Sequence, residues 1–310
     1  MRPFSLLVLL LLPCVACRPS EAASDVHSAR GSTADCGDGA ALALTERASV
    51  PLPPSAAPAG LALLADGSLV MAERGSSGVS VRAADGASTR WIAAPEPLPV
   101  LSPQDDELLA AGLTAVYRID TGRGRVDRLM DVPLRAGRIV SLAGDGRTLW
   151  VGVGGLAGGA GAVYAVSRAR PGEWRRRPMD APVHLAPAGD GRVAAAGTRA
   201  PHRVAFLDST LAVTGSAQPP ARRRRGADAR FTQALVPLDC GRLLHVVADL
   251  RSDRRELTVY QAAPRPRLLR ARTIERPIGF VHTRAGRSMV AVTEGEGRRE
   301  VVLLGWSWQP

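Results

Sequence analysis

Five histidines are the residues of this chain that could act in acid–base chemistry or bind a metal: His27, His184, His202, His245 and His282. No two of them have the three- to five-residue spacing of a zinc-binding pair, and none lies beside a cysteine. The sequence therefore predicts no metal site and no catalytic residue. His27 is expected in solvent, and His245 and His282 are expected to be ordinary strand residues. His184 is the candidate for a central channel.

Carboxylates offer a second kind of chemistry. Glu73, Glu294 and Glu296 follow hydrophobic runs, where a pair of carboxylates could bind a cation or act as acid and base; surface ion pairs are the expected role. The glycine-rich run from Gly152 to Gly161 has no strand–turn–helix context, which a dinucleotide-binding loop requires. We expect it to be a flexible turn. The sequence contains no G-x-S-x-G elbow and no P-loop.

The N-terminal segment and the cysteines indicate that the protein is exported. Residues 1–17 read as a lipoprotein-type signal peptide, because Arg2 precedes the apolar run from Leu6 to Leu12 and Ala16–Cys17 resembles a bacterial lipobox. Cys17 is the expected lipidation site, although Cys14 stands where the lipobox usually has leucine. Ordinary secretion is the alternative. Two cysteines remain, and in an oxidising envelope we expect a disulfide between Cys36 and Cys240.

The elements that must position these residues are repeated hairpins. Residues 18–40 are small, polar and aperiodic, which is typical of a flexible tether. From Pro58 onward, turn residues recur at intervals of about 39–50 residues, the period of a four-stranded propeller blade. These turns are Asp66-Gly67, Asp105-Asp106, Asp145-Gly146, Asp190-Gly191, Asp239-Cys240-Gly241 and Ala285-Gly286. Each is followed by an apolar strand, and most by a second one after another turn.

Six copies of this pattern predict an all-β protein. We expect residues 41–310 to form a β-propeller of six four-stranded blades, with five or seven blades as alternatives. The weakly alternating segment 41–52 is expected to complete the last blade and so close the ring without exposed edges.

The repeats resemble the NHL-type propeller repeat and its relatives among the lactonase and soluble-dehydrogenase propellers. The first repeat carries the resemblance, with Pro58-Ala59-Gly60, Asp66-Gly67 and Glu73-Arg74-Gly75. It implies a site in the central channel, where calcium-dependent relatives would use Glu, Asn and Asp. This chain has no Asn. Counting back from each turn gives the channel positions Gly60, Pro99, Ile139, His184, Ala234 and Gly279, of which only His184 is polar.

The chain is strongly basic, with a net charge of +11 and arginine as its only long-chain cation. Such a charge favours anionic partners. No nucleic-acid-binding motif occurs, so we expect no nucleic acid partner. Arginines such as Arg123, Arg125 and Arg128 are expected on a solvated outer face, and the run from Arg222 to Arg225 in a surface loop that could also dock on an anionic surface.

These features predict a monomeric, lipid-anchored propeller that is exported to the periplasm or outer membrane and binds a protein or glycan without a cofactor. Its membrane contact would be the lipid on Cys17. The resemblance leaves two alternatives: a metal-dependent lactonase-like hydrolase with its site in the channel, and a sugar dehydrogenase with a quinone cofactor. Propellers host many functions, so the fold alone does not choose among them.

Overall fold

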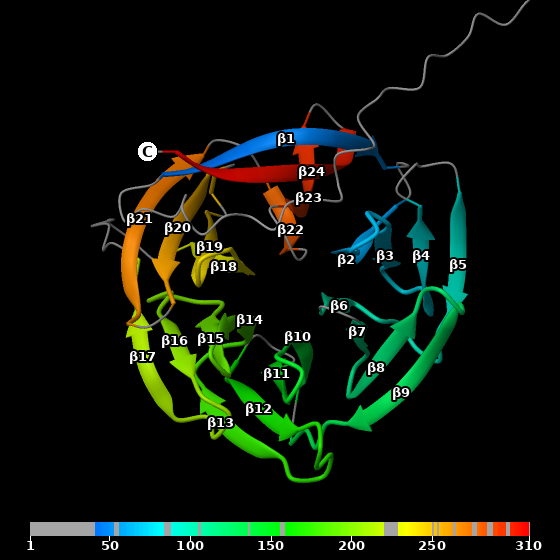
Figure 1. The fold of residues 1–310 in the computed structure, drawn as a ribbon, viewed down its shortest axis with the longest axis horizontal. Coiled ribbons are helices and arrows are strands. Elements are labelled where there is room, and N and C mark those ends of the chain that lie inside the picture. Colours follow the sequence, from blue (N-terminus) through cyan, green and yellow to red (C-terminus); the bar gives the residue numbers. More distant parts are fainter. Residues whose placement is uncertain are drawn as a thin grey trace, which may run out of the picture. The chain divides into compact units, whose positions relative to one another are not determined.

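The structure is a computed structural model. It describes residues 41–309, except for gaps at 53–55, 84–87, 105–106, 136, 156–158, 220–228, 250, 253, 263–264, 275–277, 284–287 and 296–297. The described residues form six sheets of four antiparallel strands, arranged as a ring (Figure 1). The predicted six-bladed β-propeller is therefore confirmed. Among the described residues, no helix is long and apolar enough to cross a membrane.

The first three blades follow the chain from the innermost strand outward. Blade 1 contains β2 (Pro58–Leu63), β3 (Leu69–Glu73), β4 (Gly78–Arg82) and β5 (Thr89–Ala93). Blade 2 contains β6 (Val100–Pro103), β7 (Leu108–Ala111), β8 (Ala115–Asp120) and β9 (Arg125–Asp131). Blade 3 contains β10 (Arg138–Gly144), β11 (Thr148–Gly154), β12 (Gly161–Ser167) and β13 (Arg175–Met179).

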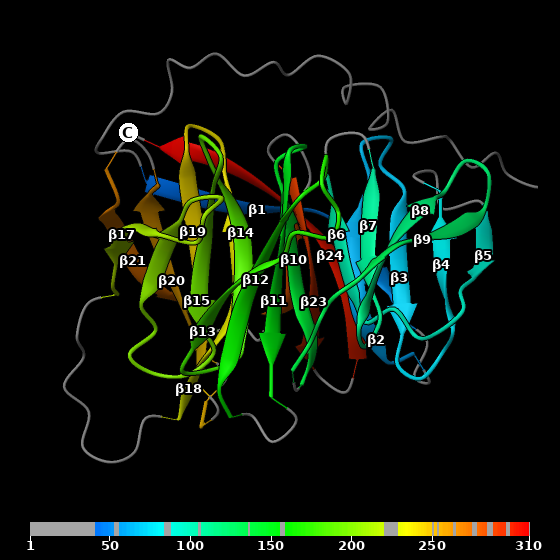
Figure 2. The same cartoon turned by 90° about the horizontal axis from the view of Figure 1, so that it is seen from below.

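The last three blades continue around the ring, and their strands run along its axis when the ring is seen from the side (Figure 2). Blade 4 contains β14 (Val183–Gly189), β15 (Arg192–Gly197), β16 (Val204–Leu207) and β17 (Val213–Ala217). Blade 5 contains β18 (Arg230–Pro237), β19 (Arg242–Asp249), β20 (Arg255–Gln261) and β21 (Arg267–Ile274). Blade 6 contains β22 (Ile278–Thr283), β23 (Ser288–Gly295), β24 (Arg298–Gln309) and β1 (Ala41–Pro51).

Aspartate turns connect the first and second strands of several blades. The Asp145 carboxylate accepts hydrogen bonds from the backbone N–H groups of Arg147 and Thr148, at 3.0 and 2.7 Å. In the β18–β19 turn, Cys240 and Gly241 have φ angles of 58° and 63°. Two consecutive positive φ angles produce the tight turn that suits the twist of a hairpin. The four marked turns that the structure describes, at 66–67, 145–146, 190–191 and 239–241, therefore lie between the first and second strands of their blades.

The core lies between neighbouring blades, because alternate residues of each strand face opposite neighbours. On β11, Leu149 and Val151 pack against blade 2, in one cluster with Leu109. Trp150, on the opposite face of the same strand, packs in the next cluster with Val193 of blade 4. Stacking of two-sided sheets explains why β11 and β19 are buried along their whole length.

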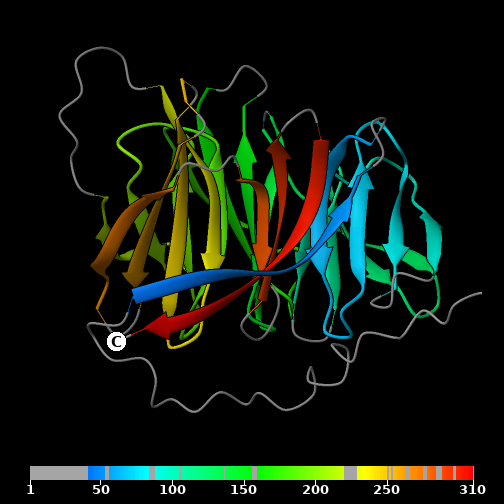
Figure 3. The same cartoon turned by 90° about the horizontal axis from the view of Figure 1, so that it is seen from above.

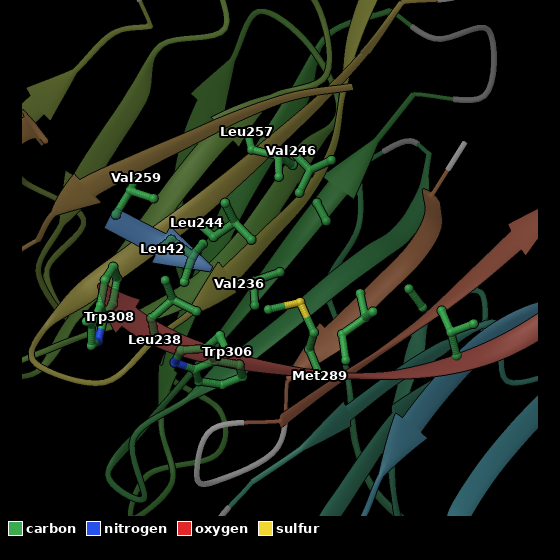
Figure 4. Close-up of a cluster of buried hydrophobic side chains, with 14 residues drawn as sticks. Leu42, Val236, Leu238, Leu244, Val246, Leu257, Val259, Met289, Trp306 and Trp308 are labelled. Atoms are coloured by element: carbon green, nitrogen blue, oxygen red, sulfur yellow. The ribbon is translucent and has the colours of Figure 1, made fainter. Parts of the chain in front are cut away.

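The ring closes where β1 pairs antiparallel with β24, as predicted from the N-terminal segment (Figure 3). The indole N–H groups of Trp306 and Trp308 both donate to one carboxylate oxygen of Asp239, at 3.2 and 2.8 Å. The guanidinium of Arg242 lies 4.2 Å from the centre of a Trp308 ring. Figure 4 shows both tryptophans in the apolar cluster that joins blades 5 and 6. Strand β24 therefore contacts blade 5 both by apolar packing and by hydrogen bonds.

Candidate functional site

The channel candidate His184 is the second residue of β14, the innermost strand of blade 4. Its side chain is half-buried, and the loss of contact with water lowers the pKa of His184 to about 4. The other counted positions lie on or beside innermost strands too: Gly60 in β2, Pro99 just before β6, Ile139 in β10, Ala234 in β18 and Gly279 in β22. The counting therefore located the inner strands of the ring.

A second histidine, His202, lies in the turn between β15 and β16, close to the start of β18. Its ring nitrogen Nδ1 is 3.3 Å from the hydroxyl oxygen of Thr232, and His202 is only 1% exposed. Its backbone has a φ of 56°, in the left-handed region that non-glycine residues rarely occupy. The backbone of Thr232 also donates to the Thr198 carbonyl at 2.9 Å, which ties this turn to blade 5.

His245 completes a chain of three polar side chains between blades 4 and 5. Its Nε2 lies 3.0 Å from the Thr232 hydroxyl oxygen, and the residue is fully buried. The hydroxyl can donate to one imidazole and accept from the other, so it links the two rings. Burial, followed by the charges of His202 and His184, lowers the pKa of His245 to about 3. The fold thus brings together three histidines that are far apart in the sequence.

In this histidine cluster of His184, His202 and His245, the latter two form a buried link through Thr232, and His184 lies near enough for its charge to lower the pKa of His245. His184 and His245 favour the neutral form because their pKa values are lowered, and the shared Thr232 hydroxyl satisfies one nitrogen on the rings of His202 and His245. Among the residues that the structure describes, no group of three or more His, Cys, Asp or Glu is placed to hold a metal ion. Sequence reasoning missed the cluster because the three histidines come from a strand, a turn and a second strand.

A different kind of site lies on the outer strand of blade 3. Three consecutive arginines, Arg175 to Arg177, occupy β13, and none forms an ion pair with a described residue. Arg175 and Arg177 donate to the carbonyls of Ser209 and Leu211 in the β16–β17 turn, each at 3.0 Å. A groove of about 430 Å³ runs beside them, lined by Arg176, Arg177, Pro178, Thr210 and Leu211.

Thr210, which lines the groove, is held in place by Asp208 behind it. The Asp208 carboxylate accepts hydrogen bonds from the backbone N–H and the hydroxyl of Thr210, at 2.8 and 2.6 Å, and these bonds, together with the charge of Arg175, lower the pKa of the Asp208 carboxyl. The Arg176 guanidinium lies 5.9 Å from the centre of the Tyr164 ring, which faces it across the strand pair. Cationic side chains beside an open groove can bind carboxylate or phosphate groups.

The arginines of blade 2 are arranged differently. On β8 and β9, Arg118 and Arg125 both pair with Asp127, at 3.3 and 2.8 Å, and Arg128 pairs with Asp131. Arg123 pairs with Asp120 at 3.8 Å. This solvated face agrees with the expectation from sequence, and its positive charge is offset locally.

Several predicted residues lie outside the described part of the chain. These are Cys17 and the rest of residues 1–40, including His27 and Cys36, together with the predicted turns Asp105-Asp106 and Ala285-Gly286, Arg222 to Arg225, and Glu296. Cys240 is exposed in the β18–β19 turn, and its disulfide with Cys36 stays a prediction. Glu73 ends β3, while Glu294 lies in β23 and His282 in β22. The glycine-rich run spans the end of β11 and the start of β12, so it belongs to a hairpin and does not open a helix.

Comparison with known proteins shows the fold alone. No known protein family matches the chain, and no curated protein does. The structure is similar to the β-propeller domain of Cps50 (Swd1) from Myceliophteria thermophila, with a TM-score of 0.50 and 12% identity over 86% of this chain and 99% of that one. It is also similar to regucalcin, a calcium-binding protein from Agrobacterium tumefaciens, with a TM-score of 0.58 and 13% identity over 84% of this chain and 95% of that one.

Proposed function

We propose that this protein is a lipid-anchored β-propeller of the bacterial cell envelope that binds an acidic partner, a protein or a glycan. The observation that carries the proposal is the set of three arginines on β13, which line or adjoin a groove and form no ion pair with a described residue. A closed ring of stacked sheets supplies a rigid support for such a surface. The hydrolase and dehydrogenase alternatives rest on resemblance, and no described side-chain cluster favours either.

The anchor is tested by replacing Cys17 with alanine. The wild-type protein is expected to incorporate labelled palmitate and to remain with the membranes after cell fractionation. The Cys17→Ala variant should lose the label and appear in the soluble envelope fraction, because a single flexible segment without a lipid has no strong membrane affinity. Unchanged membrane association, or no label in the wild type, would refute the anchor.

The binding surface is tested with the double variant Arg175→Gln/Arg176→Gln. We expect its affinity for immobilised polyglutamate or polygalacturonate to fall about tenfold at low salt, since each surface charge contributes up to about 1 kcal/mol. The difference should shrink as salt rises, because exposed charges are screened. Neutral dextran is the control matrix, and the two acidic polymers show whether a peptide-like or a glycan-like partner is preferred.

A matched variant removes the same charge elsewhere. Arg125→Gln/Arg128→Gln also loses two arginines, but these pair with Asp127 and Asp131 in blade 2. Its affinity for the acidic polymers is expected to change by less than about threefold. If the two double variants elute at the same salt concentration, the β13 arginines only protect an edge strand from pairing with other chains, and the binding proposal fails.

A further inference from the structure

A second groove lies on the rim of the ring between blades 5 and 6. It has a volume of about 280 Å³ and is lined by Ala41, Leu42, Leu257, Val259, Arg270 and Arg272. Leu42, Leu257 and Val259 are buried members of the apolar cluster that joins the two blades (Figure 4). The groove therefore has an apolar floor, which continues into the core of the ring closure.

Two arginines form the polar side of this groove. Arg270 and Arg272 are two residues apart on β21, so they project from the same face, directly across from Val259 and Leu257 of β20. Neither guanidinium group forms a hydrogen bond or an ion pair with a described residue, although the backbones of both residues pair with β20. Burial, followed by the charge of Arg270, lowers the pKa of Arg272. Both side chains are exposed to solvent at the open side of the groove, where two like charges repel each other and a bound anion would offset the repulsion.

The composition of the groove defines the chemistry of its ligand. Adjacent guanidinium groups match a phosphate, which can accept paired hydrogen bonds from each fork. An apolar floor beside them suits a ligand whose phosphate carries an apolar chain. A free inorganic anion would use the arginines and leave the floor in contact with water, so it fits the groove less well.

The position of the groove indicates where such a ligand comes from. Ala41, which lines the groove, is the residue directly after the expected tether of residues 18–40. A flexible chain of that length spans about 25 Å on average, so a lipid on Cys17 would keep this part of the rim near the membrane surface. We infer that the groove between β21 and β1 binds the phosphate of an anionic membrane lipid. This inference rests on the lipid anchor proposed above.

The test uses the full chain with Cys17→Ser, so that its own lipid does not dominate binding. Vesicles of phosphatidylcholine alone, or mixed with phosphatidylglycerol, are sedimented with the protein. We expect clear binding to the mixed vesicles only, and a loss of at least about tenfold for Arg270→Gln/Arg272→Gln. The melting temperature of this variant should not fall, because the substitutions remove a repulsion rather than a contact.

The control variant Arg138→Gln/Arg147→Gln removes two exposed arginines of blade 3 and should bind the mixed vesicles within about threefold of the parent. Equal losses in both variants would show that only net charge matters and would overturn the inference. Displacement by millimolar inorganic phosphate would overturn it as well, because the groove would then recognise the anion alone. Neither result bears on the anchor, which the palmitate experiment tests separately.

Discussion

Replacing Trp308 with alanine is expected to lower the free energy of unfolding by about 3–5 kcal/mol, the range for large buried aromatic side chains. Trp308 is 8% exposed and lies in the cluster that joins blades 5 and 6. The substitution removes its packing and also its hydrogen bond to Asp239 and its contact with the Arg242 guanidinium. Both partners lie in blade 5, so the variant weakens the point where the two ends of the chain close the ring.

Guanidinium denaturation followed by circular dichroism measures this effect, with the midpoint and the slope both fitted. Trp91→Ala is the matched control, because Trp91 lies on outer strand β5 and is 49% exposed. It should change the free energy of unfolding by no more than about 0.5 kcal/mol. Similar effects of the two substitutions would show that the β24 contacts do not determine the stability of the ring.

Much of this fold could be predicted from turn residues and apolar runs. Second and third strands such as β11, β12 and β19 are marked in the sequence because they are buried on both faces. The outer strands gave a weaker signal. β5 and β13 are exposed at most positions, so their composition resembles that of surface loops. Period and turn chemistry therefore favoured six blades, with five or seven as alternatives, before all the strands could be located.

The sites were harder to predict, because blade stacking creates them. His184, His202 and His245 come together only when blade 4 packs against blade 5, and no local pattern encodes that contact. Arg270 and Arg272 show the same limit. Their two-residue spacing places them on one face of a strand, but the groove also needs Ala41 from the other end of the chain. Sequence periodicity shows which face of the sheet a side chain lies on, but it does not show which other strand packs against that face.

The histidine cluster should make the protein sensitive to acid. In the unfolded chain a histidine has a pKa of about 6.5, whereas His245 and His184 have pKa values of about 3 and about 4 in the fold. Because the folded values are lower, the unfolded state binds protons first as the pH falls. The contribution of these two histidines to the free energy of unfolding is fully present above about pH 6.5. It is lost progressively below that pH, by about 2 kcal/mol for each histidine at about pH 5.

The variant His245→Leu isolates this contribution. Its free energy of unfolding should fall about 2 kcal/mol less than that of the wild type between about pH 8 and about pH 5, even if the variant is less stable at the higher pH. All other ionisable groups are the same in the two proteins, so the difference between their pH profiles reports on His245 alone. His27→Leu, in the expected tether, should leave the pH profile unchanged. If His245→Leu and the wild type lose stability in parallel, His245 accepts a proton inside the fold, and the histidine cluster is a solvated site rather than a neutral link between blades.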